Sequence, residues 1–438
     1  MQDLAGYRGR GLGFLKASGA EVGDVLEVET DWGTVKGTLV PRYLYDDDAH
    51  IVLKLSSGYN VGLSVAGLKS ARVKAKGEKP SFNPPPAPKS KAELPRVLII
   101  GTGGTIASRV DYRTGAVRPA TTAEDLYALI PELSDIARVE PEILLSIYSE
   151  NIQPSHWSRV GERVGRAVGE GMAGVVITMG TDTMGYTAAA LGFALNSVPI
   201  PVIFVAAQRS SDRPSSDAVL NLIAGVSMAA TAPFSGVYIA MHLDESDEKI
   251  AVHHSTRARK NHTSRRDAFQ SVGTPLAAVW SRQGFEYLDD SLPKRREATG
   301  FKPKTDFEPG VALVKFYPSM PSAHIDSLAA SGVKAVVLEG TGLGHVSTEN
   351  VEALKKYVQK GGLAFMTSQC INGMVDLNVY ETGRDLLAAG VVPLGDMLAE
   401  TALVKAMWAL ANTKSGQEAA ALMSSNVSGE LAGRRFPS

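Results

Sequence analysis

The chain contains the run Val97-Leu98-Ile99-Ile100-Gly101-Thr102-Gly103-Gly104-Thr105-Ile106-Ala107-Ser108. Its first four residues form the short apolar stretch of a buried strand, and the glycines that follow are typical of a tight turn. A second run has the same order, because Val175-Val176-Ile177 precedes Met179-Gly180-Thr181-Asp182-Thr183-Met184. Each turn therefore brings a threonine hydroxyl to the carboxyl end of a predicted parallel strand, where open α/β sheets bind their ligands.

The two threonines, Thr105 and Thr181, have two interpretations. A hydroxyl beside the backbone N–H groups of a glycine turn is suited to attack on an acyl carbon, because those N–H groups stabilise the developing oxyanion. Taken singly, Thr105 and Thr181 (with its neighbour Asp182) are better explained as caps of the helices that follow, since threonine is a good N-cap. The presence of two such turns at equivalent strand ends favours the catalytic interpretation.

A hydroxyl nucleophile needs a base, and Lys260 is the candidate. It lies in a basic stretch, residues 257–266. A lysine buried beside a carboxylate such as Asp182 can act as a base when burial favours its neutral form. A solvated basic loop is the usual explanation of so charged a stretch, and we keep it for Arg265 and Arg266.

Other sites are excluded or disfavoured by spacing. The third glycine of a dinucleotide-binding fingerprint would fall on Ile106, and no phosphate-loop motif occurs in the chain. His253, His254 and His262 have no partners at a recognised metal-ligand spacing. We therefore predict neither a metal nor a cofactor in this chain. Cys370 is an alternative nucleophile, but a lone cysteine is more often a small buried hydrophobe.

Composition limits the setting of the protein. The 438 residues carry a net charge of −1, which gives no overall attraction to nucleic acid or acidic lipid. The single cysteine fits a reducing compartment. The first residues lack the pattern of a signal peptide, and no apolar run reaches the roughly 20 residues that span a bilayer. We expect a cytoplasmic protein without membrane contact.

The pattern of strands and turns predicts an α/β protein with several domains. Residues 1–75 contain four short β runs separated by turn residues, which predicts a small SH3-like β-barrel: 25–28, 35–40, 51–55 and 59–63. Residues 76–95 form a Pro/Lys-rich linker. From residue 96, strands, glycine turns and helices alternate, which predicts a parallel sheet covered by helices on both faces. We assign residues 96–300 to a larger α/β domain and 305–438 to a smaller one.

The two threonine motifs, residues 102–107 and 180–184, resemble those of bacterial-type L-asparaginases, and the resemblance covers residues 96–438. Within that family, the chain is more similar to the D subunits of archaeal glutamyl-tRNA(Gln) amidotransferases. The predicted barrel and the segments 208–217 and 378–384 carry that closer resemblance. The resemblance implies a two-domain L-asparaginase-like α/β core behind the small barrel.

The resemblance also implies roles for individual residues. Thr105 matches the family's first nucleophile on a mobile loop, and Tyr112 matches the loop tyrosine that orients it. Thr181, Asp182 and Lys260 match a second, rigid triad. The sequence leaves open which threonine forms the acyl-enzyme.

Two further positions match the residues that bind substrate. Ser149 and Glu150 occupy the position that holds the substrate's α-carboxylate and α-amine, and Asp182 would also face the amine. Glu150 replaces the glutamine that is usual in free asparaginases, and Met179 replaces their histidine. Both differences affect whether the chain is expected to prefer glutamine or asparagine as its substrate.

The implied function is that of a glutaminase subunit. Such a subunit passes ammonia to a separate E subunit, which binds ATP and Mg²⁺ and converts Glu-tRNA(Gln) to Gln-tRNA(Gln). The tRNA is expected to bind mainly through that partner. The resemblance implies a homodimer through the asparaginase-like core and an α₂β₂ assembly. Two alternatives remain: a free-standing L-asparaginase, and a non-catalytic tRNA-binding subunit that uses the barrel and the basic loop 257–266.

Overall fold

The structure is a computed structural model that describes residues 4, 6–42, 47–56, 60–77, 91–103, 108–111, 116–119, 122–209, 216–297 and 299–432. Thr105, Tyr112 and most of the predicted linker lie outside these residues. The chain divides into two compact units. One is Met1–Pro86 together with Ser108–Pro119, and the other is Ala87–Ala107 together with Ala120–Ser438.

The N-terminal unit contains one antiparallel sheet with the strand order β4-β3-β2-β1-β5. Its elements are α1 (Gly9–Ala17), β1 (Val25–Thr30), β2 (Gly33–Leu39), β3 (His50–Lys54), β4 (Asn60–Ser64), η1 (Val65–Gly67) and β5 (Leu68–Ala75). Alternate residues of the strands, such as Leu26 and Val28 in β1, are buried against Leu15 of α1. The sequence pattern missed β5, and the closure of this sheet into an SH3-like barrel stays a prediction. A separate hairpin pairs β7 (Ser108–Asp111) with β8 (Ala116–Pro119).

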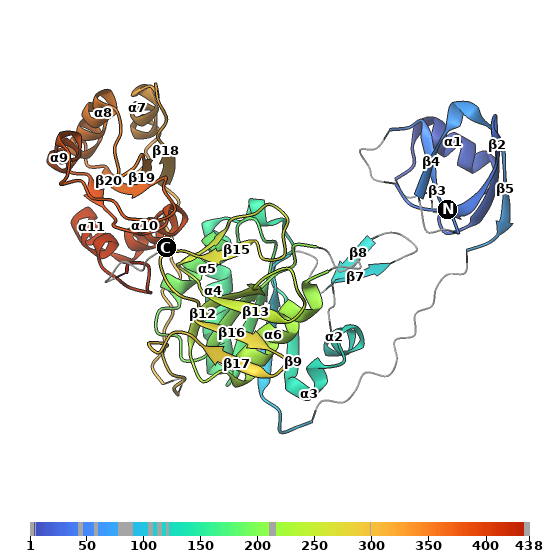
Figure 1. Ribbon diagram of the computed structural model, residues 1–438, viewed down its shortest axis with the longest axis horizontal. Coiled ribbons are helices and arrows are strands. Elements are labelled where there is room, and N and C mark those ends of the chain that lie inside the picture. Colours follow the sequence, from blue (N-terminus) through green and yellow to red (C-terminus); the bar gives the residue numbers. More distant parts are fainter. Residues whose placement is uncertain are drawn as a thin grey trace. The chain divides into compact units, whose positions relative to one another are not determined.

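The larger unit is built on an eight-stranded sheet with the order β17-β16-β13-β12-β11-β10-β6-β9 (Figure 1). Five neighbouring strands are parallel: β9 (Arg138–Ile143), β6 (Arg96–Gly101), β10 (Gly174–Thr178), β11 (Pro201–Val205) and β12 (Gly236–His242). The other three are antiparallel: β13 (Lys249–His254), β16 (Ala278–Ser281) and β17 (Gly284–Tyr287). The expectation of a parallel sheet is therefore wrong for this edge, because the connections 243–248, 255–277 and 282–283 contain none of the crossover helices that usually join parallel strands.

Helices cover both faces of this sheet. Successive side chains of a strand point to opposite faces, so Leu98 and Ile100 join one buried cluster while Val97 and Ile99 join the other. The first cluster contains side chains of α4 (Pro154–Gly169) and α5 (Met184–Ala194). The second contains side chains of α2 (Ala123–Leu129), α3 (Leu133–Ile136) and α6 (Ala218–Thr231).

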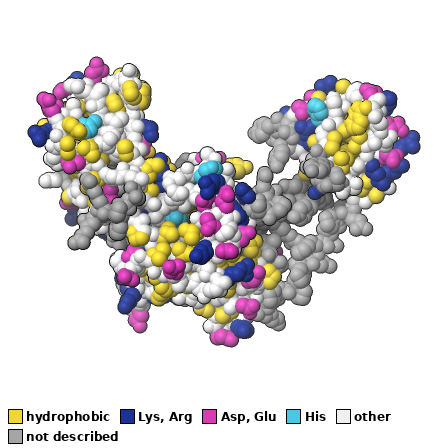
Figure 2. Space-filling view, in the orientation of Figure 1, with side chains coloured by type: hydrophobic (Ala, Val, Ile, Leu, Met, Phe, Trp, Pro, Cys, Tyr) yellow, Lys and Arg dark blue, Asp and Glu magenta, His cyan; other side chains and the backbone are white. Residues whose placement is uncertain are grey.

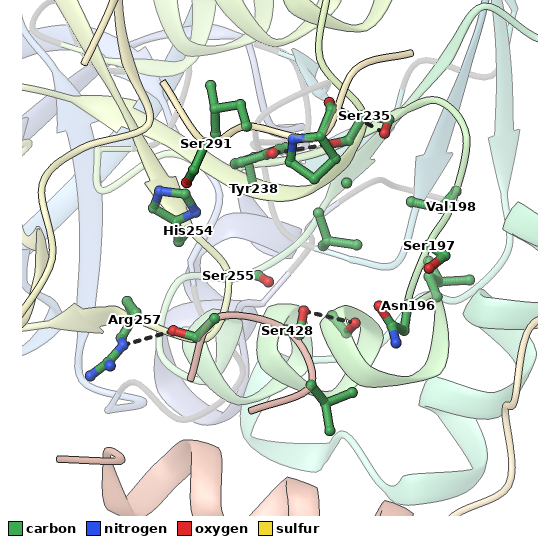
Figure 3. Close-up of a pocket in the computed structure, with 18 of the residues that line it drawn as sticks. Asn196, Ser197, Val198, Ser235, Tyr238, His254, Ser255, Arg257, Ser291 and Ser428 are labelled. Atoms are coloured by element: carbon green, nitrogen blue, oxygen red, sulfur yellow. Dashed lines mark hydrogen bonds between the residues drawn. The ribbon is translucent and has the colours of Figure 1, made fainter. Parts of the chain in front are cut away.

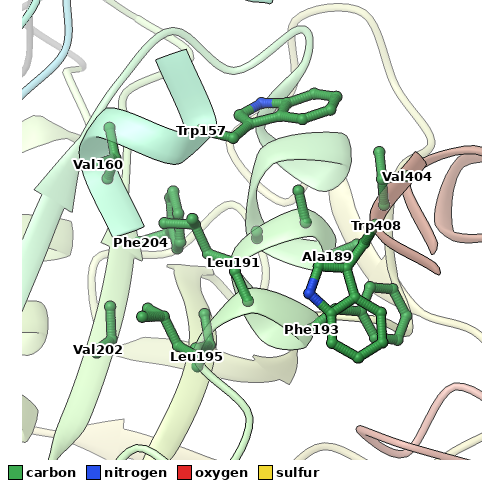
Figure 4. Packing of buried hydrophobic residues seen from close by; sticks show 14 of the residues in the cluster. Trp157, Val160, Ala189, Leu191, Phe193, Leu195, Val202, Phe204, Val404 and Trp408 are labelled. Atoms are coloured by element: carbon green, nitrogen blue, oxygen red, sulfur yellow. The ribbon is translucent and has the colours of Figure 1, made fainter. Parts of the chain in front are cut away.

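A smaller parallel sheet follows, with the order β18-β19-β20-β21. Its elements are β18 (Val311–Lys315), α7 (Ala323–Ala330), β19 (Ala335–Gly340), α8 (Thr348–Gln359), β20 (Leu363–Ser368), α9 (Glu381–Ala388), β21 (Val392–Pro393), α10 (Ala399–Asn412) and α11 (Gly416–Ser424). Helix α10 joins the two sheets, because its Trp408 stacks on Phe193 of α5 with ring centroids 5.7 Å apart (Figure 4). One hydrophobic core thus extends from the larger sheet into the smaller one.

The charges of the whole chain nearly cancel, with 45 Lys and Arg against 46 Asp and Glu. On the face shown in Figure 2, Lys and Arg side chains are interspersed with Asp and Glu. Among the described residues, none of the helices combines the length and the apolar character that crossing a bilayer requires.

Candidate active site

The two threonine turns leave neighbouring strands at the same edge of the large sheet. Strands β6 and β10 are parallel, and Gly101 lies opposite Thr178 in their register. Beyond that pair, both the backbone N–H and the hydroxyl of buried Thr102 donate to the Thr178 carbonyl, at 2.9 and 3.0 Å. The starts of the two turns are therefore bonded to each other.

A third segment, residues 147–151, packs against both turns. Gly103 has a φ of +128°, and a Cβ there would lie 2.0 Å from the carbonyl oxygen of Ile147. A Cβ on Gly180 would lie 2.9 Å from Cβ and Oγ of Ser149. Only glycine allows these close approaches, which bring the 147–151 segment to the carboxyl edge of β6 and β10.

The 147–151 segment carries the two predicted substrate ligands. Ser149 and Glu150 belong to the short helix η2 (Ser149–Asn151), in which Ser149 is buried and Glu150 is exposed. The hydroxyl of Thr183 donates to the carbonyl oxygen of Ser149 at 2.6 Å. This bond fixes the segment to the second threonine turn.

Lys260 reaches the same edge from a different hairpin. Strand β14 (Ala258–Lys260) pairs with β15 (Phe269–Ser271). The Lys260 ammonium lies 2.8 Å from Thr181 Oγ1 and 2.6 Å from Asp182 Oδ1. The Lys260 side chain is 15% exposed and that of Asp182 is 69% exposed. A nucleophile candidate, a base candidate and a carboxylate thus lie within hydrogen-bond reach of one another.

The helix after the second turn begins without the cap that the alternative interpretation expected. Helix α5 starts at Met184, its N-cap residue is Thr183, and Thr183 forms no side-chain capping bond. Thr181 is therefore not the N-cap residue. Its hydroxyl contacts Lys260 instead.

Two expectations about the basic stretch and the cysteine are wrong. Arg266 is not solvated, because its side chain is 12% exposed and lies 2.5 Å from Asp247, whereas Arg265 is half-exposed and pairs with Asp267. Cys370 is exposed and so is not a small buried hydrophobe. Its loop follows β20, whose apolar residues end at Met366.

The histidines have separate surroundings. Burial lowers the pKa of His253 to about 3, and its Nδ1 bonds Ser271 Oγ at 2.9 Å. Burial also lowers the pKa of His254, which lies 3.1 Å from an Asp289 carboxylate oxygen. The exposed His262 accepts bonds from two backbone N–H groups of its own loop. Within the described part of the chain, no group of three His, Cys, Asp or Glu side chains is placed to hold a metal ion.

Sequence reasoning missed two residues that shape this edge. Thr183 lies within the second threonine motif but was given no role there, and its bond to Ser149 joins segments 34 residues apart. Arg257 precedes Lys260, but its side-chain partners lie 139 and 172 residues further along the chain. No local pattern of residues carries a signal of such partners.

Known families match three parts of the chain. Residues 96–292 match the family described as asparaginase, N-terminal, and residues 310–423 match the glutaminase/asparaginase C-terminal domain. Residues 20–73 match the GatD N-terminal domain. The three matches follow one another along the chain.

Solved structures share the fold of the two C-terminal domains. The thermostable L-asparaginase from Thermococcus kodakarensis superposes with a TM-score of 0.67 at 32% identity, over 77% of this chain and all of its own. L-asparaginase I from Vibrio cholerae gives 0.66 at 25% identity, over 77% of this chain and 99% of its own. The asparaginase-like α/β core expected from the sequence is therefore confirmed.

Curated relatives match the chain over nearly its full length. The D subunit of the glutamyl-tRNA(Gln) amidotransferase of Metallosphaera sedula is 48% identical over 98% of this chain and 96% of its own length. The corresponding D subunit of Pyrococcus furiosus is 45% identical over 95% of this chain and 96% of its own. At these identities and lengths, the chain belongs to the family of the D subunits of glutamyl-tRNA(Gln) amidotransferases.

Proposed function

We propose that this chain is the glutaminase subunit of a tRNA-dependent amidotransferase. The observation that carries the proposal is the contact of Lys260 with Thr181 and Asp182, at the edge where both threonine turns begin. The family of the chain supports the same assignment, because its named relatives are amidotransferase subunits.

The proposed reaction is acyl transfer through a threonine. The threonine oxygen, of Thr105 or of Thr181, bonds to the side-chain amide carbon of glutamine, and its proton passes to the base. Backbone N–H groups of the glycine turns hold the oxyanion of the tetrahedral intermediate. The C–N bond then breaks, and the nitrogen takes a proton and leaves as ammonia. Water hydrolyses the γ-acyl ester, which releases glutamate and restores the hydroxyl.

Lys260 is the proposed base for Thr181, because 2.8 Å between Nζ and Oγ1 suits direct proton transfer. Asp182 orients Lys260 and, with most of its side chain exposed, can also receive the substrate's α-amine. Ser149 and Glu150 complete the proposed site for the α-carboxylate and the α-amine. Thr105 is proposed as the other candidate nucleophile and Tyr112 as the residue that orients it; both lie outside the described residues.

We further propose the assembly that this reaction needs. Ammonia is small and partly uncharged, so the chain that releases it for synthesis must be joined to the chain that uses it. The proposed partner is an E subunit that binds ATP and Mg²⁺, in a cytoplasmic α₂β₂ complex. Glu-tRNA(Gln) is proposed to bind mainly through this partner. The D-type chains would pair through their asparaginase-like cores.

The test is glutamine hydrolysis by the purified chain, alone and with the E subunit of its native source, Glu-tRNA(Gln) and ATP. We expect slow hydrolysis alone and a strong increase with all components present. Full asparagine hydrolysis without a partner would instead indicate a free-standing L-asparaginase. Co-purification from the native source checks the assembly independently.

Variants separate the catalytic role from the binding role. Thr105→Ala and Thr181→Ala are expected to abolish glutamine-dependent amidation while amidation with added ammonia continues at the partner. Normal glutamine-dependent rates in both variants would favour a non-catalytic tRNA-binding subunit. Alkylation of Cys370 is the control, and it should leave glutaminase activity intact.

A further inference from the structure

The last described segment, residues 425–432, is held by a fully buried ion pair. The Glu430 carboxylate lies 2.5 Å from Lys405 Nζ of α10, and both side chains are fully buried. The two carboxylate oxygens of Glu430 also accept the backbone N–H groups of Val427 and Ser428, at 2.9 and 2.6 Å. A carboxylate with these partners fixes the turn at 427–430 in one conformation.

That turn presents two carbonyl oxygens to the chain just before β14. The Ser428 carbonyl accepts the hydroxyl of Thr256 at 2.9 Å, and the Gly429 carbonyl accepts Arg257 Nε at 2.9 Å. The same Arg257 guanidinium bonds the carboxylate of Asp396 at 3.0 Å and its carbonyl at 3.1 Å. Arg257 is almost completely buried and has partners for all three nitrogens.

These contacts, at Thr256 and Arg257, lie four and three residues before Lys260. Arg257 leads directly into β14, and its carbonyl accepts the backbone N–H of Val272 beyond β15. The backbone carbonyl of Thr256 is held in addition by the buried hydroxyl of Thr401 at 2.8 Å. The strand that carries Lys260 is therefore anchored at its start by the 425–432 segment and by α10.

The 425–432 segment is not packed on every side. It forms one wall of a cavity of about 400 Å³ and contributes Ser428 to the lining, while Arg257 and Asn196 line the cavity from other parts of the chain (Figure 3). Ser428 bonds across to the Gly192 carbonyl at 3.1 Å. The segment is therefore held by these hydrogen bonds together with Val427 and Leu431, which pack against the large hydrophobic core.

We propose that Thr256 and Arg257, held by the 425–432 segment, are positioning residues for Lys260. The inference rests on the proposed function for its catalytic consequence. A shift of about 1 Å in a reacting group can cost about 100-fold in rate, so loosening the start of β14 is expected to affect catalysis through the position of Lys260. Substrate binding at Ser149 and Glu150, on a separate segment, is left in place.

The variants are Thr256→Val, which replaces the hydroxyl with a methyl group of similar size, and Arg257→Lys, which keeps the charge but loses the planar fork. The matched control is Arg163→Lys. Arg163 is a comparably buried arginine of α4 that pairs with Glu142 and Glu170, away from β14. All three chains are assayed in the complex, well below their unfolding temperatures.

The first measurement does not depend on activity. Lys260 acetylation by acetic anhydride is followed by mass spectrometry relative to the exposed Lys334. We expect several-fold faster labelling of Lys260 in Thr256→Val and Arg257→Lys, and an unchanged rate in Arg163→Lys. Unchanged labelling in both folded variants would overturn the proposal. If labelling rises but the wild-type complex has no glutaminase activity, the proposed function fails and the anchoring of Lys260 stands.

The second measurement is steady-state glutamine hydrolysis. We expect kcat to fall about 10-fold in Thr256→Val and Arg257→Lys while KM stays within about 2-fold, since the loss is in the geometry of the reacting groups. In a Lys260→Met background the same substitutions should add no further loss. If the substitutions lower kcat by the same factor in the Lys260→Met background as in the wild type, Thr256 and Arg257 have a merely structural role. An equal fall in kcat for Arg163→Lys would show the same.

Discussion

Thr183 donates a 2.6 Å hydrogen bond from its hydroxyl to the backbone carbonyl of Ser149. The bond joins the turn that carries Thr181 and Asp182 to the segment that carries both predicted substrate ligands. The Thr183 hydroxyl, together with the close approach of Gly180 to Ser149, therefore fixes the distance between the proposed reacting groups and the proposed binding groups.

Replacing Thr183 with valine keeps the shape of the side chain and removes this bond. We expect KM for glutamine to rise about 5- to 10-fold, because the bond contributes about 1 kcal/mol and its loss frees the Ser149 segment. Steady-state kinetics of the complex measures the change. Thr183→Ser is the control and should retain the wild-type KM. A valine variant with unchanged KM would show that the Ser149 segment is held by other contacts.

Lys260→Met removes the proposed base and should lower kcat by about 10²- to 10⁴-fold. Lys260→Arg distinguishes a base from a group that supplies only positive charge, because a guanidinium keeps the charge and does not give up its proton. If Lys260 is a base, arginine should fail to restore the rate. Lys249→Met, an exposed lysine of β13, is the control and should leave kcat unchanged. Recovery by arginine would indicate that only the positive charge is needed.

Gly180→Ala tests the close approach of the second turn to Ser149. The new methyl group would lie 2.9 Å from Cβ and Oγ of Ser149, so one of the two segments must move. We expect a loss of about 1–3 kcal/mol in stability, together with a raised KM. Gly169→Ala is the matched control at the end of α4, where a Cβ meets nothing within 4 Å. Thermal unfolding should show that Gly169→Ala is tolerated and Gly180→Ala is not.

His253 predicts a loss of stability in acid. Burial lowers its pKa from 6.5 to about 3 in the folded chain, so the unfolded chain binds a proton between these values and the folded chain does not. The stabilising contribution is complete above pH 6.5 and is lost as the pH falls towards 3. At pH 5 the loss is about 2 kcal/mol. Denaturant unfolding of wild type and His253→Gln at pH 7.5 and 5 measures it, and equal pH slopes in the two proteins would contradict it.

Local patterns in the sequence were enough to predict the parallel part of the sheet. The apolar runs at 97–100 and 175–177 are short and end in glycine turns, and both form buried strands of the large sheet. The antiparallel edge was not predicted, because β13, β16 and β17 differ from parallel strands only in their connections. Strand β5, whose residues are half-buried or exposed, lacks the alternation that marks a strand in sequence.

The amino-acid sequence by itself determined the two buried strands and the glycine turns that begin after them, because apolar runs and glycines are local signals carried by neighbouring residues. The sequence also indicated the family, through motifs that can be recognised without a structure. The resemblance to a family grouped Lys260 with Thr181 and Asp182, but only the tertiary structure gave their contact, across 79 and 78 residues of chain. The tertiary structure alone decided that the segment at 425–432 anchors Arg257. Contacts of this kind arise from packing and strand order. The residues that form these contacts therefore show no periodic pattern in the sequence.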